Sequence, residues 1–351
     1  MIQMNSWLKL FYVLQIIFGA PAFYFWPKGI IFESHAATNS SEEIGMRLKD
    51  KIAIVAGGAQ GIGEGIALCL AEEGADVAIV DINGEAAGRV ADRVKALGRR
   101  SLPLAADLTE EKQISKAIKD AADFFGRLDI LVNNVGGVVP GMARETAEYA
   151  ATLEDEAASV PHMRFSPDIW DRYYRLNLKS HLMLGNAVTP HFVRQRSGRI
   201  INIASVSGRI AEPDHMPYAA MKAADISLTW SLARGLARFN ITVNCVCPGF
   251  VYTQMWEEGV AKYLERDRKA VSELKSKGQK LPRSLQRFAD ADVSGITPYE
   301  YWLKFWVGPN IPLGREQTVE DMGRAVVFFA SDDGKNITGQ TLHVDGGQVM
   351  R

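Results

Sequence analysis

Short apolar runs alternate with longer amphipathic stretches from Lys51 to the end of the chain. The runs are rich in β-branched residues, which is typical of buried parallel strands, whereas the stretches between them repeat their apolar positions with the period of a helix. The predicted strands are Ile52–Ala56, Val77–Val80, Leu102–Ala105, Ile130–Val132, Arg199–Ile203, Thr242–Val246 and Thr341–Val344. This order predicts one doubly wound α/β domain with a seven-stranded parallel sheet.

Two segments interrupt the alternation, residues 138–164 and 254–310. Each follows the carboxyl end of a predicted strand, which is the edge where an open α/β sheet binds its ligands. Insertions there either shape a substrate pocket or serve as surface decoration and oligomer contacts. In the second, the basic stretch Lys262–Arg287 fits either an anionic substrate or a solvated helix. An aromatic group follows that either caps a bulky apolar substrate or packs the insertion itself: Tyr299, Tyr301, Trp302, Phe305 and Trp306.

The first 45 residues form an apolar extension ahead of the α/β domain, which is expected to span residues 46–351. Residues 7–26 are mostly apolar and aromatic, and they are long enough for a short membrane span. Three origins fit this extension: an upstream start codon ahead of the domain's own opening at Met46, a membrane anchor, or a cleaved signal. We expect a cytoplasmic protein, associated with a membrane only if residues 7–26 are an anchor.

Composition and charge narrow the class of partner. The 351 residues are 47% hydrophobic and 23% charged with a formal net charge of -1, so the chain is globular and no overall field attracts nucleic acid. The three cysteines, Cys69, Cys245 and Cys247, are too few for a disulfide framework and fit core positions in a reducing compartment. Because no further Cys or His stands at zinc-site spacing, no metal is predicted.

A glycine-rich turn joins the first predicted strand to the first helix, in the order Ala56-Gly57-Gly58-Ala59-Gln60-Gly61-Ile62-Gly63. Such a turn lets the backbone approach a pyrophosphate, whose charge is stabilised by the amino terminus of the helix. The second strand ends at Asp81, whose carboxylate can accept both hydroxyls of an adenosine ribose and repels a 2′-phosphate. Neither Gln60 nor Ile82 supplies a cation for such a phosphate, so NAD is favoured over NADP unless Arg99 and Arg100 reach the site.

A serine, a tyrosine and a lysine follow in order at the fifth predicted strand and the next helix. The run Ile200–Ser205 delivers the Ser205 hydroxyl to the ligand-binding edge, and Tyr218 and Lys222 stand four residues apart on one helix face. A phenol transfers protons poorly at neutral pH unless a nearby ammonium group stabilises the phenolate. The spacing therefore predicts that Lys222 activates Tyr218.

Together these motifs resemble those of the short-chain dehydrogenase/reductase family, from about Lys49 to Gly347. The resemblance rests on motifs in the family's order: the glycine turn, Asp107-Leu108, Asn133-Asn134-Val135-Gly136, Asn177, Ser205, Tyr218, Lys222 and Pro248-Gly249. The chain departs from the family at Ala56, usually threonine, and at Val135, usually alanine. Loss of the threonine hydroxyl is expected to loosen the glycine turn.

The resemblance implies a Rossmann-type, NAD(P)-dependent enzyme that interconverts a secondary alcohol and a ketone. Asp107 and Leu108 would flank the adenine, Asn134 would line a ribose, and Val251 with Thr253 would hold the nicotinamide carboxamide, whereas Asn133 is expected to be structural. The expected cofactor contacts are Gly57, Gln60, Gly61, Ile62, Gly63, Asp81, Ile82, Asp107, Leu108, Asn134, Tyr218, Lys222, Pro248, Gly249, Val251 and Thr253.

The family also implies a mechanism, in which Ser205 and Tyr218 bind the substrate oxygen and Tyr218 is the acid or base. Asn177 would hold a water that connects Lys222 to solvent. A homotetramer is implied, packed through the predicted helices Asp168–Arg196 and Pro217–Phe239. Two alternatives stay open: a reductase of 3-oxoacyl or sugar-like carbonyl substrates, and a catalytically idle NAD-binding scaffold. In either enzyme the partner is a small-molecule alcohol or ketone.

Overall fold

The computed structural model describes residues 46–139, 141–153, 160–288 and 295–350. The expectations for the first 45 residues, including a membrane anchor at residues 7–26, lie outside this described part. Within it, no helix combines the length and the apolar character that crossing a membrane requires.

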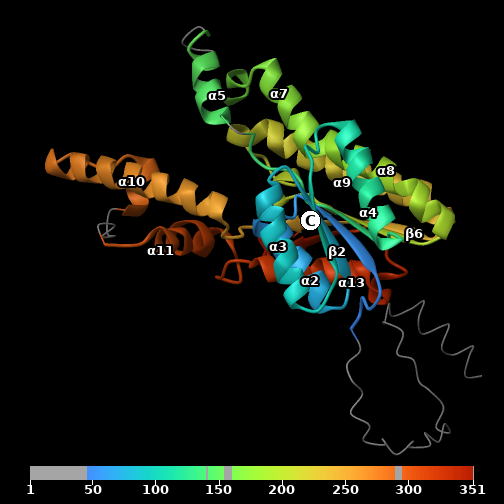
Figure 1. The fold of residues 1–351 in the computed structure, drawn as a ribbon. Helices are drawn as coiled ribbons and strands as arrows, with labels where there is room; N and C mark the ends of the chain where they lie inside the picture. Colours follow the sequence, from blue (N-terminus) through green and yellow to red (C-terminus); the bar gives the residue numbers. More distant parts are fainter. Residues whose placement is uncertain (1–45, 140, 154–159, 289–294, 351) are drawn as a thin grey trace, which may run out of the picture. The chain divides into compact units, whose positions relative to one another are not determined.

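Seven parallel strands form one sheet in the order β3-β2-β1-β4-β5-β6-β7 (Figure 1). Their bounds are β1 (Ile52–Ala56), β2 (Asp76–Asp81), β3 (Ser101–Ala105), β4 (Ile130–Asn133), β5 (Gly198–Ile203), β6 (Ile241–Pro248) and β7 (Thr341–Val344). All seven predicted strands and the doubly wound α/β fold are confirmed. The strand order reverses between β1 and β4, and a crevice for ligands forms at the carboxyl ends of strands at such a point.

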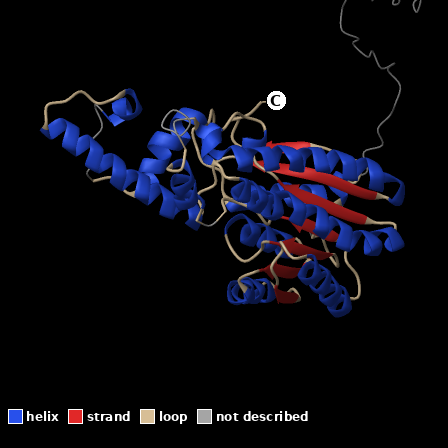
Figure 2. Ribbon diagram, turned by 90° about the horizontal axis from the view of Figure 1, so that it is seen from above, coloured by secondary structure: helices blue, strands red, loops and turns tan. Residues whose placement is uncertain are grey.

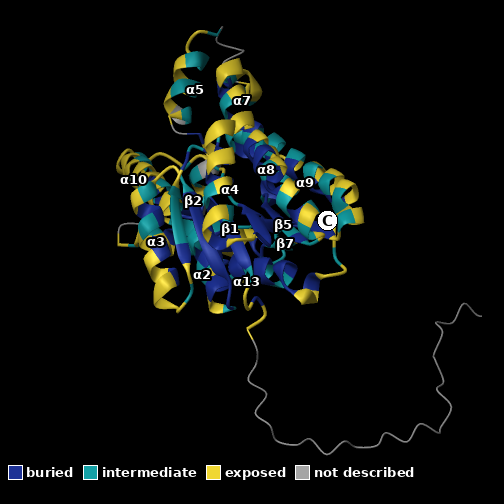
Figure 3. Ribbon diagram, turned by 45° about the vertical axis from the view of Figure 1, so that its right-hand side comes forward, coloured by how far each residue is buried: buried dark blue, intermediate teal, exposed yellow. Residues whose placement is uncertain are grey.

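Helices cover both faces of the sheet (Figure 2). One face carries α2 (Gly61–Glu72), α3 (Gly84–Ala96) and α13 (Val319–Ala330), and the other carries α4 (Glu111–Phe125), α8 (Ser180–Gln195) and α9 (Met216–Leu236). Each face has its own hydrophobic core: the first core lies under α2, α3 and α13, and the second core lies under α4, α8 and α9. Successive strand residues point to opposite faces, so along β1 Ala53 and Val55 belong to the first core and Ile52 and Ile54 to the second. The central strands are therefore buried on both sides, whereas the edge strands β3 and β7 are partly exposed (Figure 3).

The predicted helix Asp168–Arg196 forms, but a π-helical turn interrupts it. The chain runs through α7 (Pro167–Tyr174), the π turn η2 (Arg175–Lys179) and α8. A π turn adds one residue to the helical repeat and changes where the following side chains point. The other predicted long helix is α9, which continues into the 3-10 turn η5 (Ala237–Phe239).

Among its described residues, the first insertion contains the short helical segments α5 (Met142–Ala150) and η1 (Pro161–Arg164). The described part of the second contains α10, which extends away from the sheet in both ribbon views (Figures 1 and 2), and shorter segments. Their bounds are α10 (Gln254–Ser276), η6 (Arg283–Phe288), α11 (Pro298–Trp302), η7 (Leu303–Val307) and α12 (Gly308–Asn310). The expected basic helix thus ends before Gly278, where φ is +64°. The 3-10 turns that complete the chain are η3 (Val206–Gly208), η4 (Pro213–His215) and η8 (Asp332–Gly334).

Most of the aromatic residues of the second insertion pack the insertion itself, whereas Tyr299 is 42% exposed. Trp302 is completely buried, and its ring stacks on Trp306 with centroids 6.0 Å apart. Two residues of the loop after β6 join this inserted aromatic core: the Trp302 ring lies 5.4 Å from Phe250 and 5.7 Å from Tyr252. The insertion therefore anchors the loop that follows β6, which carries three of the expected cofactor contacts, Gly249, Val251 and Thr253.

Candidate active site

The glycine turn between β1 and α2 is shaped to accept an anion. Gly57 and Gly61 have φ of +77° and +55°, the left-handed region that glycine tolerates. A Cβ on Gly63 would lie 2.0 Å from the Gly57 carbonyl oxygen, so only glycine fits there. The side chain of Gln60, at the N-cap, makes no capping hydrogen bond within the described residues. The first N–H groups of α2, including that of Ile62, are therefore placed to bind a phosphate.

Two side chains tie this turn to the neighbouring strands. The Asn134 side chain donates to the Gly57 carbonyl at 2.7 Å, and the Asn134 main-chain N–H donates to the Ala56 carbonyl at 3.0 Å. On the other side, the Ala59 N–H donates to the Asp81 carboxylate at 3.2 Å. The turn is bonded on both sides although Ala56 lacks a hydroxyl, and the expectation that the missing threonine hydroxyl loosens it stays a prediction.

Asp81 stands at the end of β2 with capacity to bind a ribose. Its carboxylate accepts the Ala59 and Asn83 N–H groups, at 3.2 and 3.0 Å. A carboxylate offers about four lone-pair sites, so further acceptor sites remain for hydroxyl donors. Ile82 beside it is 73% exposed, leaving its side chain available to a ligand.

Arg99 and Arg100 are bound at the other end of β2. Both pair with Asp76, the first residue of that strand, at 3.1 and 2.7 Å. A strand advances about 3.3 Å per residue, so five residues separate this ion pair from Asp81 by roughly 16 Å. Neither arginine provides the cation that a 2′-phosphate requires beside Asp81.

Ser205, Tyr218 and Lys222 meet at the carboxyl end of β5. Ser205 is the N-cap of η3, and its hydroxyl accepts the Ser207 N–H at 3.1 Å. Lys222, on α9, is 3% exposed and donates to the carbonyl of Ile203, the last residue of β5, at 2.8 Å. Its ammonium nitrogen lies 5.9 Å from the centre of the Tyr218 ring. The helix thus brings the cation next to the phenol and close to the serine.

Lys222 keeps its charge although it is buried. Burial lowers the pKa of its ammonium group, but the charges of Asp225 and Tyr218, the hydrogen bond to Asp225 and the neighbouring Cys245 raise it, so the pKa lies above its ordinary value. The lysine is therefore an ammonium ion at neutral pH, as the stabilisation of a neighbouring phenolate requires.

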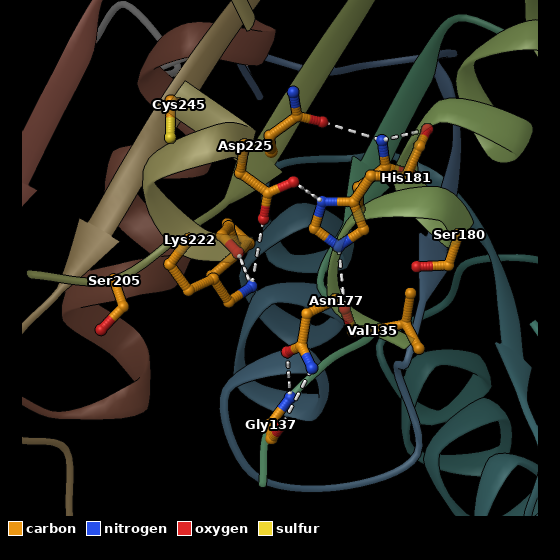
Figure 4. A network of polar contacts seen from close by, with 12 residues as sticks. Val135, Gly137, Asn177, Ser180, His181, Ser205, Lys222, Asp225 and Cys245 are labelled. Atoms are coloured by element: carbon orange, nitrogen blue, oxygen red, sulfur yellow. Dashed lines mark hydrogen bonds and ion pairs between the residues drawn. The ribbon is translucent and has the colours of Figure 1, made fainter. Parts of the chain in front are cut away.

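Asn177 lies in the π turn η2 and is completely buried. Its amide oxygen accepts the Gly137 N–H at 2.7 Å and its amide nitrogen donates to the Gly137 carbonyl at 3.0 Å (Figure 4). At the adjacent Gly136, a Cβ would lie 2.8 Å from the Asn177 oxygen and 3.2 Å from the Lys222 nitrogen. Asn177 therefore holds the loop after β4 against Lys222, and the water expected at this place stays a prediction.

The loop after β6 lies beside the glycine turn. Pro248 ends β6, and the Gly249 N–H donates to a carbonyl of β7 at 3.2 Å. Val251 is 2% exposed, and Thr253 is the N-cap of α10. A Cβ on Gly61 would contact the Thr253 side chain at 3.4 Å, so the glycine turn and this loop are neighbours.

Three expected residues beside the crevice are held by bonds or packing of their own. The Asp107 carboxylate accepts the N–H and the hydroxyl of Thr109, at 2.9 and 2.7 Å. Leu108 is 4% exposed and belongs to the second core, so its contact with an adenine stays a prediction. Asn133 is completely buried and donates to Asn202 at 2.8 Å, as expected of a structural amide.

Two buried groups beside Lys222 were not anticipated from the sequence. Asp225 lies 3.3 Å from the Lys222 nitrogen, and the His181 ring lies 3.0 Å from Asp225 (Figure 4). Asp225 follows Lys222 by three residues, a spacing that places both on one helix face and could have indicated the contact. His181 comes from α8, and no local pattern links it to Asp225.

The three cysteines are free and buried, as their positions in apolar stretches predicted. A hydrogen bond to Cys247, together with burial, raises the pKa of the Cys245 thiol well above its ordinary value. Cys245 is therefore a neutral core residue beside the lysine.

Comparison with known proteins agrees with this site. A family model described as short chain dehydrogenase matches residues 51–264, and one described as enoyl-(acyl carrier protein) reductase matches residues 290–348. The chain is 35% identical to a 3-oxoacyl-[acyl-carrier-protein] reductase of Staphylococcus aureus strain Mu50, covering 86% of this chain and 98% of that protein. It is 31% identical to a subunit of the (2S)-[(R)-hydroxy(phenyl)methyl]succinyl-CoA dehydrogenase of Thauera aromatica, covering 87% and 99%.

A solved structure of a dehydrogenase has a similar fold. The 7α-hydroxysteroid dehydrogenase complexed with NADH and 7-oxo glycochenodeoxycholic acid is 28% identical, with a TM-score of 0.65 over 88% of this chain and 97% of that one. The fold, the order of the motifs and the full-length relatives agree. The chain belongs to the short-chain dehydrogenase/reductase family, whose members are NAD(P)-dependent oxidoreductases that act on CH–OH or carbonyl groups.

Proposed function

We propose that the chain interconverts a secondary alcohol and a ketone, with NAD as its preferred cofactor and Tyr218 as acid and base. The observation that carries the proposal is the buried Lys222 ammonium, 5.9 Å from the Tyr218 ring and bonded to the end of the strand that delivers Ser205. A charged group this deeply buried is costly unless it has partners, so its position beside a phenol points to a functional site.

The residues of the crevice fit a nicotinamide dinucleotide. Gly57, Gly61 and Gly63 leave room for a pyrophosphate at the amino terminus of α2, and Asp81 retains acceptor capacity for ribose hydroxyls. When bound, the cofactor supplies or accepts the hydride. Thr253 adjoins the glycine turn, so the loop that carries it is placed to contact the same ligand.

The chain's own residues then handle the proton. Ser205 and Tyr218 hydrogen-bond the substrate oxygen and hold it in place. In alcohol oxidation the Tyr218 phenolate accepts the hydroxyl proton, and the Lys222 ammonium stabilises that phenolate by its charge. In ketone reduction Tyr218 returns the proton to the same oxygen.

Preference for NAD follows from the charges along β2. The Asp81 carboxylate lies where a 2′-phosphate would stand, and like charges repel. Arg99 and Arg100, which could have compensated, are engaged by Asp76 at the start of the strand. A ratio of kcat/KM for NADH over NADPH well above one is expected.

A second candidate is the reduction of 3-oxoacyl thioesters, because relatives of 30% and 35% identity carry that name. The inserted helix α10 gives it no electrostatic support: it holds five basic residues (Lys262, Arg266, Arg268, Lys269 and Lys275) against five acidic ones (Glu257, Glu258, Glu265, Asp267 and Glu273). Four further basic residues of the predicted stretch Lys262–Arg287 follow the helix: Lys277, Lys280, Arg283 and Arg287. The candidate therefore rests on the relatives and on this basic stretch, whose role stays a prediction.

A substrate panel tests both candidates. Secondary alcohols with NAD and with NADP, and ketones and acetoacetyl-CoA with NADH and with NADPH, are followed by the absorbance of the reduced nicotinamide. Turnover of simple alcohols and ketones with NAD(H) supports the proposal, and turnover confined to the thioester supports the second candidate. No turnover of any substrate by the folded protein would contradict both and would favour the idle scaffold.

We also propose a cytoplasmic homotetramer. Large apolar side chains are exposed on the helices that cover one face of the sheet: Leu182 on α8 is 37% exposed and Trp230 on α9 is 49% exposed. Such positions suit contacts between copies of the chain. Light scattering coupled to size-exclusion chromatography measures the oligomer mass, and cell fractionation measures the location.

A further inference from the structure

A buried carboxylate and a buried imidazole stand in line behind the Lys222 ammonium (Figure 4). Asp225 and His181 are both completely buried. One oxygen of Asp225, Oδ2, lies 3.3 Å from Lys222 Nζ, and the other, Oδ1, lies 3.0 Å from His181 Nδ1. The second ring nitrogen of the histidine, Nε2, lies 2.8 Å from the main-chain oxygen of Val135.

The hydrogen-bonding partners of His181 indicate where protons lie on its ring and on Asp225. A main-chain carbonyl only accepts hydrogen bonds, so His181 Nε2 carries a proton. Without a second proton, Nδ1 would turn a lone pair toward a carboxylate oxygen 3.0 Å away, and two acceptors at that distance repel each other. Neither of these two atoms has a hydrogen-bond partner among the described residues, so the contact is favourable only with a proton on His181 Nδ1 or on Asp225.

This shared proton keeps the charge of the lysine effective. With the proton, His181 and Asp225 are neutral as a pair, either as imidazolium and carboxylate or as imidazole and carboxylic acid. Without it, the Asp225 carboxylate would carry an uncompensated negative charge 3.3 Å from the ammonium. Seen from Tyr218, that negative charge would largely cancel the positive one.

The remaining titratable groups around the pair do not supply this charge. On α9 these are Lys222 itself and Tyr218, and on β6 they are Cys245 and its hydrogen-bonded neighbour Cys247. Because its raised pKa leaves Cys245 a neutral thiol, the nearest compensation for Asp225, apart from Lys222, is the proton shared with His181.

We infer that His181 and Asp225 are positioning residues of the catalytic site: Asp225 fixes the Lys222 ammonium in place, and the proton it shares with His181 preserves the positive charge that Tyr218 experiences. The inference rests on the proposed roles of Tyr218 and Lys222. According to this inference, His181 influences the pH dependence of the reaction through Asp225, because the contacts of its ring given above are with Asp225 and Val135.

Two variants test it by their charge. In His181→Gln the amide nitrogen can still donate to the Val135 carbonyl, but the shared proton is lost, so the Asp225 carboxylate becomes unbalanced. We expect the pH at which alcohol oxidation is half-maximal to rise by about one unit, and the rate at neutral pH to fall about tenfold. In the double variant His181→Gln/Asp225→Asn the carboxylate is removed as well, and the profile should return toward that of the wild type.

A matched control separates charge from the general cost of changing a buried acid. Asp129 is a buried carboxylate at the opposite edge of the sheet, where it accepts the Ile52 N–H at 3.0 Å. Asp129→Asn should destabilise the fold in urea without moving the pH profile. A merely structural role for His181 predicts the same behaviour for His181→Gln, and it predicts that the double variant is no better than the single one.

Tyr218→Phe, measured with the fastest alcohol of the panel, distinguishes a failure of the proposed function from a failure of the proposed role of His181 and Asp225. If Tyr218→Phe keeps wild-type turnover, the proposed function fails. If Tyr218→Phe is inactive while His181→Gln keeps the wild-type pH profile, or while the double variant fails to restore it, this inference is overturned and the proposed function stands.

Discussion

Replacing Gly63 by alanine adds one atom, the Cβ, that is expected to distort the glycine turn. The added Cβ would lie 2.0 Å from the Gly57 carbonyl oxygen and 2.6 Å from the Asn134 side-chain nitrogen. Those two atoms are bonded to each other at 2.7 Å and tie the turn to β4. The methyl group would therefore separate the partners of the bond that holds the turn.

The size of the effect follows from these distances. Carbon and oxygen atoms normally approach to about 3.3 Å, so the backbone must move by roughly 1.3 Å. Overpacking of this kind costs about 1–3 kcal/mol, and we expect the upper part of that range because the obstructing oxygen belongs to the main chain rather than to a flexible side chain. If the first N–H groups of α2 bind the pyrophosphate as proposed, displacing them should also weaken NADH binding at least about tenfold, which is about 1.4 kcal/mol.

Urea unfolding measures the first effect, and titration of NADH fluorescence measures the second. The matched control is Gly88→Ala in α3, where a Cβ would meet nothing within 4 Å. Alanine in a helix interior is more stable than glycine by about 0.5–1 kcal/mol, so this variant should be slightly stabilised and should bind NADH normally. A Gly63→Ala protein with the stability and the NADH affinity of the wild type would refute the assignment of this turn.

Three further predictions concern cofactor preference, the inserted aromatic core and pH. Asp81→Ala should lower the preference for NADH over NADPH by about 1.5–3 kcal/mol in kcat/KM, and an unchanged ratio would mean that this carboxylate is only solvated. Trp302→Ala should lower the free energy of unfolding in urea by about 3–5 kcal/mol. It should also raise the Kd of NADH, because Phe250, in the loop after β6, packs on the Trp302 ring. A hydrogen bond from Arg47 lowers the pKa of Glu73 below 4.5, so its contribution to stability is present above that pH and lost as the pH falls through the lower folded value. Glu73→Gln should therefore cost about 0.5 kcal/mol at pH 7, and the difference from the wild type should vanish in acid; a difference that persists there would contradict the ion pair as its cause.

The central strands could be predicted from the sequence because each is covered on both faces, which leaves a short and mostly apolar run. β1, Ile52–Ala56, is buried at every position, and its predicted bounds are those observed. The order of the strands does not follow from such local patterns, since β1 pairs with β4 rather than with β3. The π turn at Arg175–Lys179 was also not predicted, because one added residue hardly changes a helical repeat.

The same distinction holds for the candidate site. Local spacing placed Tyr218 beside Lys222, and it placed the glycine turn between a strand and a helix. His181 carries no local signal, because its partner Asp225 belongs to another helix, and only the packing of α8 against α9 brings them within 3.0 Å. Likewise, the sequence left two roles open for the aromatic residues of the insertion, and burial shows that Trp302 packs the insertion whereas Tyr299 is exposed.

The account depends most directly on the Tyr218 hydroxyl as the group that transfers the proton. Tyr218→Phe removes that hydroxyl and keeps the ring that stands 5.9 Å from Lys222. General acid–base groups contribute about 10²–10⁴-fold to the rate, so kcat should fall at least about a hundredfold while the Kd of NADH changes by less than about twofold. Turnover within a few-fold of the wild type would contradict the central claim.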